Sequence, residues 1–341
     1  MSRLSLPHRT TRSLAAVTLA SAMLALAGCG SGGGDADGQD SGSSAASETR
    51  TVSTPKGDVD VPADPKRVVV LNYALAGYLY DMDVPVTATI PEDADQEAGE
   101  FSEFWGDAPS EDGTEFLPWS PDGFDLEAIL EADPDLIIAG GWGFPNFQAD
   151  AAYDDLTAIA PTVMVDKSFA DWQDQAEFLA VDVFDKQEAY DDMVSTYEAR
   201  VEEVGDAIEV PAQPTSFLSV TGDGTPYLVF EGTGLPLMFD QLGFETNDLV
   251  AQHGLEPYQP GGDLAELSTE QLGQIVDSES LFVLGFNADT TSVEALSSEP
   301  AYGSLPAFQS DNAFDLPYWA LRHDYDEALA LLDMVEEEFG K

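Results

Sequence analysis

Basic residues are scarce in this chain, and their scarcity limits its partners. The sequence holds 12 lysines and arginines against 65 aspartates and glutamates, for a formal net charge of −53 at pH 7. A nucleic-acid-binding protein neutralises phosphates with clustered lysine and arginine side chains, so nucleic acid is excluded as a partner. The acidic residues are scattered and form no D-x-D-x-D-G calcium loop. We therefore interpret them as a solvated surface rather than a cation site.

Cysteine is also scarce, because Cys29 is the only one. It follows an N-terminal stretch that carries three arginines and then an apolar run from Leu14 to Ala27. This run is shorter than the roughly 20 apolar residues that span a bilayer, and its charge pattern is typical of a signal peptide. The small residues before Cys29 resemble the bacterial lipobox. We expect residues 1–28 to be a signal peptide and Cys29 to carry a lipid; a buried structural thiol is the alternative.

The segment after Cys29 lacks large apolar residues. Gly30 to Thr49 consists almost wholly of glycine, serine, alanine, aspartate, glutamine and glutamate, a composition that cannot bury a core. Such a coil has a root-mean-square reach of about 25 Å. We expect residues 29–50 to be a flexible linker between a membrane anchor and a folded part that begins near Thr51.

Several enzyme signatures are absent too. The patterns G-x-S-x-G, H-E-x-x-H and G-x-x-x-x-G-K-[ST] do not occur, which excludes the hydrolases and nucleotide-binding proteins that depend on them. Only His253 and His323 remain after the signal peptide, which disfavours a zinc or manganese site built from histidines and carboxylates. Two carboxylates can cleave a glycosidic bond, so a secreted hydrolase is a remote alternative. With 65 acids, no particular pair stands out.

Strand-like and helix-like patterns alternate along the rest of the chain. A short hairpin is expected over residues 51–61, because apolar residues alternate on both sides of a Pro-Lys-Gly turn. Beyond it, β-branched runs alternate with helical spacing, which predicts an α/β fold with a mostly parallel sheet. The expected strands are 67–71, 84–89, 136–139, 159–165, 215–220, 227–230 and 281–284. The expected helices are 74–82, 125–132, 234–242, 271–276 and 325–339.

One segment between the two halves differs in kind. From Trp172 to Val204 there is no glycine or proline, and apolar residues recur in steps of three, four and seven. This pattern predicts one helix of roughly 50 Å, which is suited to bridging two domains. Lys186 and Gln187 interrupt the apolar stripe once, so two helices with a hidden break are the alternative.

A short pattern recurs in the two halves. Glu127 lies two residues after Asp125, and Glu270 lies two residues after Ser268, each ahead of an expected strand. Aspartate and serine are favourable helix N-caps, and glutamate in the first turn complements the helix dipole. Capping alone could account for this repetition.

The order of these features resembles the substrate-binding lipoproteins of ABC importers for iron-siderophores, haem and cobalamin. The resemblance rests on residues 67–71, Asp133-Pro-Asp-Leu136-Ile-Ile and Ile159-Ala-Pro161-Thr in that order, and it covers everything from Thr51 onward. It implies a class III periplasmic-binding-protein fold, in which two Rossmann-like α/β lobes are joined by a single long backbone helix and hold the ligand between them. We expect an N-terminal lobe over 51–168, an interlobe helix over 169–209 and a C-terminal lobe over 210–341.

The resemblance also gives the repeated glutamates a purpose. In this family one surface glutamate of each lobe docks onto arginines of the permease, and Glu127 and Glu270 match those positions. The implied protein is a monomeric receptor, anchored through Cys29 to the outer face of the cell membrane. It has no catalytic residues, no metal site of its own and no cofactor other than the lipid.

Candidate ligand contacts follow the expected strands, because ligands of open α/β sheets bind beyond the carboxyl ends of the strands. Aromatic side chains there offer the rigid apolar area that a bulky chelate needs. The residues in question are Asn72, Tyr73, Trp142, Phe144, Phe286 and Asn287. The resemblance adds Trp119, Tyr318, Trp319 and Arg322. Each aromatic, taken singly, could serve core packing instead.

Arg322 is the candidate contact for an anionic ligand, with an ion pair to Asp324 or Asp326 as the alternative. A single cleft arginine argues against a highly charged triscatecholate and favours a hydroxamate chelate. The predicted function is therefore capture of an iron(III)-siderophore and its delivery to an ABC permease. A haem ligand, which needs an axial histidine or tyrosine, or cobalamin is the alternative.

Overall fold

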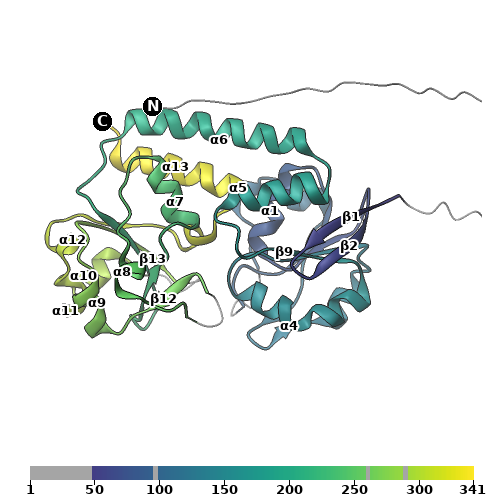
Figure 1. Cartoon of the computed structure of the whole chain (residues 1–341), viewed down its shortest axis with the longest axis horizontal. Coiled ribbons are helices and arrows are strands. Elements are labelled where there is room, and N and C mark those ends of the chain that lie inside the picture. Colours follow the sequence, from purple (N-terminus) through teal and green to yellow (C-terminus); the bar gives the residue numbers. More distant parts are fainter. Residues whose placement is uncertain (1–47, 95–98, 259–261, 287–290) are drawn as a thin grey trace, which may run out of the picture. The chain divides into compact units, whose positions relative to one another are not determined.

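The computed structural model describes residues 48–94, 99–258, 262–286 and 291–341 (Figure 1). The predicted lipidation site Cys29 and the candidate contact Asn287 lie outside the described residues, as does the predicted signal peptide. The described part opens with the predicted hairpin, in which β1 (Thr49–Thr54) pairs antiparallel with β2 (Gly57–Pro62). Val52 and Val61 of this hairpin are buried, so one face of the hairpin packs against the core.

The first sheet is entirely parallel, as the sequence predicts. Its strands follow the order β5-β4-β3-β8-β9. The central strand β3 is a valine run that is fully buried, which is typical of a parallel strand covered on both faces. The strands are β3 (Val68–Val70), β4 (Val86–Thr89), β5 (Glu115–Phe116), β8 (Leu136–Gly140) and β9 (Thr162–Val165). Because all five run in one direction, their carboxyl ends meet at one edge of the sheet.

Short helices and a small hairpin surround the first sheet. Helix α1 follows β3 directly, and α4 follows β8. The helices are α1 (Tyr73–Asp81), a 3₁₀ turn at Glu103–Trp105, α2 (Ala108–Asp112), α3 (Leu126–Glu131) and α4 (Phe144–Ile159). The hairpin comprises β6 (Trp119–Ser120) and β7 (Gly123–Phe124).

The second sheet is mixed. Its order is β12-β11-β10-β13-β14, with β13 parallel to both of its neighbours and β11 antiparallel to both of its own. The turn between β10 and β11 is too short for the crossover that a parallel pair needs. The strands are β10 (Thr215–Val220), β11 (Pro226–Val229), β12 (Leu264–Glu266), β13 (Ser280–Gly285) and β14 (Ala313–Asp315). Its helices are α7 (Gly234–Gln241), α8 (Leu249–His253), α9 (Thr269–Ile275), α10 (Val293–Ser297), α11 (Pro300–Gly303) and α12 (Pro306–Gln309).

The prediction of one continuous helix from Trp172 to Val204 is wrong. Helix α5 (Trp172–Glu177) runs into a π-helical segment, Phe178–Val183, and the long helix α6 (Gln187–Ala207) starts only afterwards. The break is at Asp185, whose φ of 58° is left-handed and is tolerated by aspartate better than by most residues. The interruption of the apolar stripe at Lys186 and Gln187 was the sequence signal for this break. Two α/β sheets with a long helix between them in the sequence nevertheless confirm the predicted fold class.

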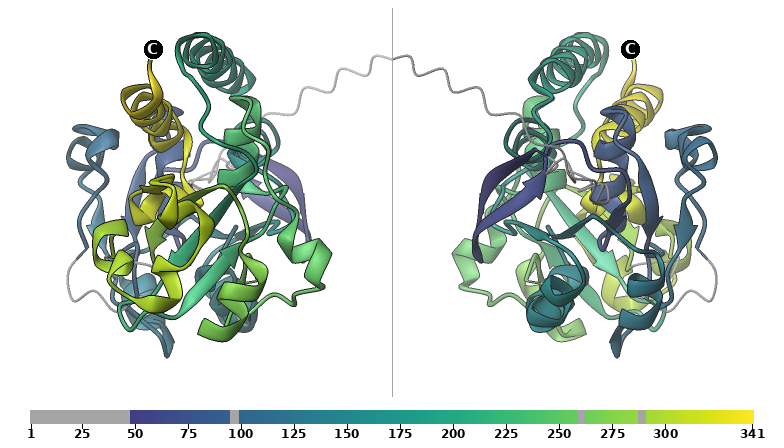
Figure 2. Two further views of the ribbon diagram at one scale, coloured as in Figure 1. Left: turned by 90° about the vertical axis from the view of Figure 1, so that its left-hand side faces the viewer. Right: turned by 90° about the vertical axis from the view of Figure 1, so that its right-hand side faces the viewer.

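Two helices, not one, lie along the connection between the sheets. Helix α6 runs beside the C-terminal helix α13 (Tyr325–Phe339), as Figures 1 and 2 show. Arg200 of α6 forms ion pairs with Asp333, at 2.7 Å, and Glu336 of α13. Both sheets fall in one compact unit, Ala46–Lys341.

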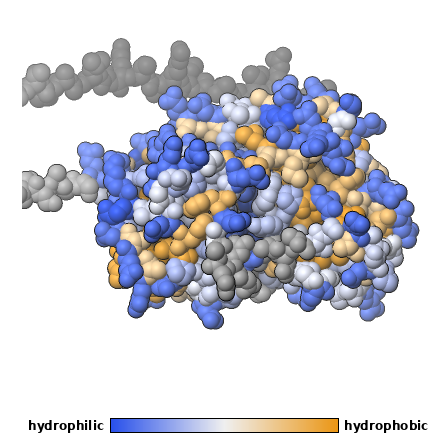
Figure 3. All heavy atoms as spheres, turned by 180° about the vertical axis from the view of Figure 1, so that it is seen from behind, coloured by the Kyte–Doolittle hydropathy of each residue, from blue (hydrophilic) through white to orange (hydrophobic). Residues whose placement is uncertain are grey.

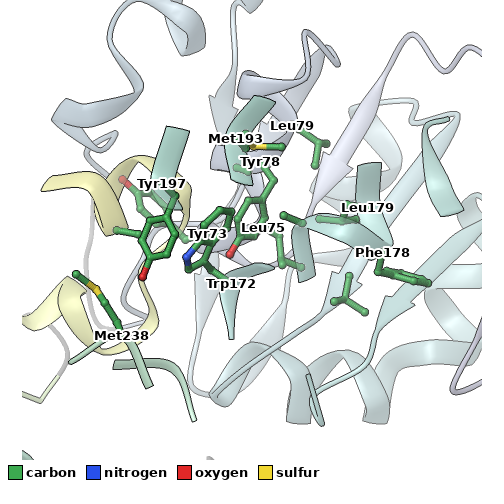
Figure 4. Packing of buried hydrophobic residues seen from close by; sticks show 14 of the residues in the cluster. Tyr73, Leu75, Tyr78, Leu79, Trp172, Phe178, Leu179, Met193, Tyr197 and Met238 are labelled. Carbon is green, nitrogen blue, oxygen red and sulfur yellow. The ribbon is translucent and has the colours of Figure 1, made fainter. Parts of the chain in front are cut away.

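A single apolar cluster connects the elements of both sheets. It extends from Val68 of β3 to Phe282 of β13 and includes α5, α6 and α13. Trp172 lies within it, 2% exposed, with its ring centroid 5.1 Å from that of Tyr197 (Figure 4). The ring centroid of Tyr325 lies 5.4 Å from that of Trp172. Helices α5, α6 and α13 therefore meet at this one side chain.

We expect Trp172→Ala to destabilise the protein by about 3 to 5 kcal/mol, the usual cost of removing a large buried aromatic side chain. The measurement is urea unfolding followed by circular dichroism. Leu130→Ala is the matched control, because Leu130 is 60% exposed and should change stability by less than about 0.5 kcal/mol. A similar small loss for Trp172→Ala would contradict a central role for this side chain.

The surface is largely hydrophilic, with apolar areas between the polar ones on the face that Figure 3 presents. Within the described ranges, none of the helices combines the length and the apolar character needed to cross a bilayer.

Candidate functional site

A cavity of about 240 Å³ lies between the two sheets. We call it the main cavity. On the side of the first sheet it is lined by the β8–α4 loop and by residues that follow β9. On the other side it is lined by the end of β11, the start of α7 and the segment before α13. The lining residues are Trp142, Gly143, Lys167–Phe169, Val229, Phe230, Thr233–Leu235, Gly262, Asp263, Leu321 and Arg322.

The β8–α4 loop depends on glycine. Gly140, Gly141 and Gly143 all have positive φ angles, and a Cβ on Gly140 would lie 2.4 Å from the carbonyl oxygen of Val165. Asn72 holds this loop, since its amide donates to the carbonyl oxygens of Gly140, at 2.7 Å, and of Trp142, at 3.1 Å. Asn72 thus positions the loop that carries Trp142.

Trp142 is fixed at the wall of the main cavity. Its indole Nε1–H donates to the carbonyl oxygen of Phe169, at 2.9 Å. The next residue, Gly143, closely approaches the other half of the molecule, because a Cβ there would lie 2.7 Å from Nε of Arg322. The loop of the first sheet and Arg322 therefore meet at van der Waals distance.

Arg322 is paired with an acid that the sequence analysis did not foresee. Its Nε donates to Oδ2 of Asp263 at 2.7 Å, and the two side chains are 25% and 22% exposed. The expected alternative, a pair with Asp324 or Asp326, is not what the structure shows. Burial of Arg322 works against its charge, and Asp263 outweighs that effect and raises the arginine pKa. Arg322 is therefore a cavity-lining cation that is already neutralised.

A smaller cavity of about 50 Å³ lies beside the main one, and we call it the side pocket. Trp142, Leu321 and Arg322 line both cavities. The side pocket brings together six of the predicted ligand contacts, which are Asn72, Tyr73, Trp142, Tyr318, Trp319 and Arg322. Its other lining residues are Ala74, Glu92, Pro145, Leu321 and Glu327.

Three predicted contacts line neither cavity. Trp119 is 8% exposed in the core of the first sheet, where its indole donates to Gln148. Phe144 packs between Trp119 and Phe147, with ring centroids 6.3 Å and 6.1 Å away. Phe286 packs on Tyr227 at 4.8 Å. These aromatics serve packing in the structure.

Sequence reasoning missed some lining residues. Glu92 follows β4, and Phe169 follows β9, so both lie beyond carboxyl ends of parallel strands and the strand-end rule would have found them. Asp263 precedes β12 on an antiparallel part of the second sheet. No comparable sequence signal marks Asp263.

The two repeated glutamates occupy equivalent places in the two halves. Glu127 is the second residue of α3 and Glu270 the second residue of α9, and both are exposed. Asp125 caps α3, and Ser268 forms a capping box with Gln271, so both residues are helix N-caps, as predicted. Each helix leads through a short turn into a strand, β8 or β13. The start of each helix therefore lies toward the carboxyl end of the strand that follows it.

The histidines lie away from the cavities. His323 is 1% exposed, its Nδ1 is 2.9 Å from the carbonyl oxygen of Ala320, and burial lowers its pKa to about 4. His253 ends α8. Neither is among the residues that line the two cavities. Within the described part of the chain, no three histidine, cysteine, aspartate or glutamate side chains are grouped in a way that could hold a metal ion.

Comparison with known proteins gives consistent matches. The family described as periplasmic binding protein matches residues 68–318. The ferric enterobactin-binding periplasmic protein FepB of Escherichia coli is 27% identical over 86% of this chain and 92% of its own length. The probable siderophore-binding lipoprotein YfiY of Bacillus subtilis is 28% identical over 87% of this chain and 90% of its own. The structure of holo-ViuP superposes with a TM-score of 0.73 at 21% identity, covering 86% of this chain and 95% of that one.

Proposed function

The chain belongs to the periplasmic binding protein family, and from this premise we propose that it is the receptor of an ABC importer that captures a ferric siderophore. Its relatives are substrate-binding proteins, and the chain is a binding protein rather than an enzyme. The name of FepB refers to binding of ferric enterobactin, and that of YfiY to binding of a siderophore. The receptor holds the chelate in the main cavity and hands it to the permease.

The Arg322–Asp263 ion pair is the observation from which we infer the charge of the ligand. A strongly anionic triscatecholate needs unpaired cations, but Arg322 already donates to Asp263 at 2.7 Å. Among the described residues, Lys167 is the one further cation in the lining of the main cavity, and its single charge does not balance a chelate with several negative charges. A hydroxamate chelate has little net charge, and apolar walls with a few polar groups suit it. We therefore favour a ferric hydroxamate as the ligand.

Haem finds less support as the ligand. An axial haem ligand would have to come from histidine or tyrosine, and no histidine among the described residues lines either cavity. The hydroxyls of Tyr73 and Tyr318 in the side pocket donate to the carbonyl oxygen of Glu100 and to Glu92. Both hydroxyls are thus already engaged.

Delivery of the ligand to a permease requires the receptor to stay at the membrane and to contact the permease. We propose that Cys29 carries the lipid, that the predicted linker tethers the protein outside the membrane up to the start of β1 at Thr49, and that Glu127 and Glu270 contact the permease. The exposure of both glutamates at equivalent helix starts supports this assignment. The proposed lobes are residues 51–168 and 210–341, connected through 169–209.

Quenching of tryptophan fluorescence tests the ligand class, because Trp142 lines both cavities and Trp319 lines one. The panel is ferrichrome, ferric enterobactin, ferric citrate, haem and cobalamin. We expect ferrichrome, a neutral hydroxamate chelate, to bind at least about tenfold more tightly than the triscatecholate, because the latter would bury uncompensated charge. Tighter binding of ferric enterobactin would overturn the hydroxamate assignment. Binding of haem or cobalamin alone would overturn the siderophore assignment.

A further inference from the structure

The side pocket has the composition of a binding site for an organic cation. Four aromatic side chains form much of its lining, namely Tyr73, Trp142, Tyr318 and Trp319. Aromatic ring faces attract ammonium groups, most strongly where water is excluded. Two carboxyl side chains, Glu92 and Glu327, complete the polar part of the lining.

Glu92 is the acid of this pocket that lacks a matching cation. One of its oxygens, Oε2, accepts from the hydroxyl of Tyr318 at 2.8 Å, and no ion pair of Glu92 occurs among the described residues. Burial raises the pKa of Glu92 to about 7, although the Tyr318 hydrogen bond and the charge of Arg322 act in the opposite direction. A desolvated carboxylate gains from a positively charged partner.

Arg322 does not supply that partner. Its guanidinium is held by Asp263 at 2.7 Å on the side of the main cavity, and Gly143 packs directly against it. Glu327 is occupied differently, because it closes the capping box of α13 with Asp324 and accepts from Ser102 at 3.3 Å. Glu92 is therefore the one carboxyl in the lining that remains available to a ligand.

The two cavities differ in the part of a ligand that each can hold. About 50 Å³ in the side pocket exceeds the roughly 10 to 15 Å³ that a cavity needs to hold one water. It has room for an ammonium group and a few methylenes but not for a metal chelate. The main cavity, about 240 Å³, is the larger space, and the shared residues Trp142, Leu321 and Arg322 make the two spaces neighbours.

We infer that the side pocket is a subsite for a protonated amine on the ligand, with Glu92 as its counter-ion and the aromatic side chains as its walls. This inference rests on the proposed function and narrows it, since it selects a ferric hydroxamate that carries a pendant amine. Glu92 becomes a specificity residue of the receptor.

A matched pair of ligands tests the subsite. Ferrioxamine B is a ferric trihydroxamate with a free amine, and its N-acetyl derivative keeps the chelate but loses the charge. We expect the wild-type protein to bind the amine form about tenfold more tightly, the size of one charge-assisted hydrogen bond. Equal affinities for the two ligands would overturn the inference, and this comparison needs no variant.

Substitution of Glu92 tests whether this residue causes the preference for the amine form. In Glu92→Gln the ratio of the two affinities should fall to less than about twofold, because the amide keeps the shape but not the charge. Glu115→Gln is the matched control, since it removes an exposed carboxylate from β5 of the same sheet and should leave the tenfold ratio intact. A ratio that persists in Glu92→Gln, or that falls equally in Glu115→Gln, would overturn the role of Glu92. If neither ferrioxamine binds at all while haem or cobalamin does, the proposed function fails instead.

Discussion

Uptake of the ferric chelate is expected to stop when Glu127 and Glu270 are both replaced by alanine, while chelate binding by the isolated receptor stays unchanged. Truncating one partner of a hydrogen-bonded charge pair at an interface costs about 2 kcal/mol or more. Two such losses, one in each half, amount to about 4 kcal/mol, or roughly a thousandfold in docking affinity. The measurement is uptake of radioactive iron by cells that express the variant, beside fluorescence titration of the purified protein.

The single variants separate the two contacts. Glu127→Ala and Glu270→Ala should each weaken uptake. The double variant should be worse than either, because the two residues are on helices of different halves and the effects of distant sites add. The matched control is Glu131→Ala with Glu279→Ala, which removes one exposed glutamate from each half. Normal uptake by the Glu127/Glu270 double variant, or an equal loss in the control, would rule out docking through these two residues.

Much of the fold could be predicted because it depends on local patterns. Buried β-branched runs predicted β3 and β8. The amphipathic C-terminal pattern predicted α13 with the bounds that the structure shows. The break before α6 depends on one left-handed residue, Asp185, which is not a glycine or proline and therefore carries no strong breaker signal. The interruption of the apolar stripe at Lys186 indicated where a break could lie. It did not show that the helix would end there, because the helical pattern continues on both sides.

The site was predictable only in part, for a physical reason. Strand ends are local features, so Tyr73 and Trp142 could be placed near a cleft from sequence alone. The partner of Arg322 is 59 residues away, and the acids close to it in sequence, Asp324 and Asp326, point elsewhere. Such long-range pairing depends on how the second sheet and α13 pack. The charge balance of the cleft therefore emerges only with the tertiary structure.

The start of α13 buries carboxyl groups against α1, and this arrangement controls how stability responds to pH. Burial raises the pKa of Asp81 to about 9, with Asp326 and Asp324 adding repulsion. Burial also raises the pKa of Asp324 to about 7, even though it accepts from the indole of Trp105 at 2.6 Å. Burial raises the pKa of Asp326 to about 6 as well. The native state therefore holds protons that the unfolded chain has already released.

Stability should accordingly fall as the pH rises. A carboxyl whose pKa is higher in the folded state contributes stability that is full below its unfolded value, 3.8 for Asp81, and is lost as the pH rises toward about 9. Each proton held only by the native state is worth about 1.4 kcal/mol per pH unit. Asp81 alone then predicts a loss of about 3 kcal/mol between about pH 6 and pH 8.5. Buried His323, whose pKa is lowered to about 4, acts in the opposite direction only below its unfolded value of 6.5.

Asp81→Asn isolates the largest of these contributions. The amide mimics the protonated acid, so the variant should be more stable than the wild type at about pH 8.5, and its urea midpoint should depend less on pH. Asp83→Asn is the matched control. Asp83 lies two residues after Asp81 and is exposed, and its substitution removes the same charge. If the control flattens the pH dependence as much as Asp81→Asn does, the large net charge of the chain is the cause. If instead only Asp81→Asn does so, the response originates where α1 meets the buried carboxyls of α13, in the contact that joins the first sheet to the C-terminal helix.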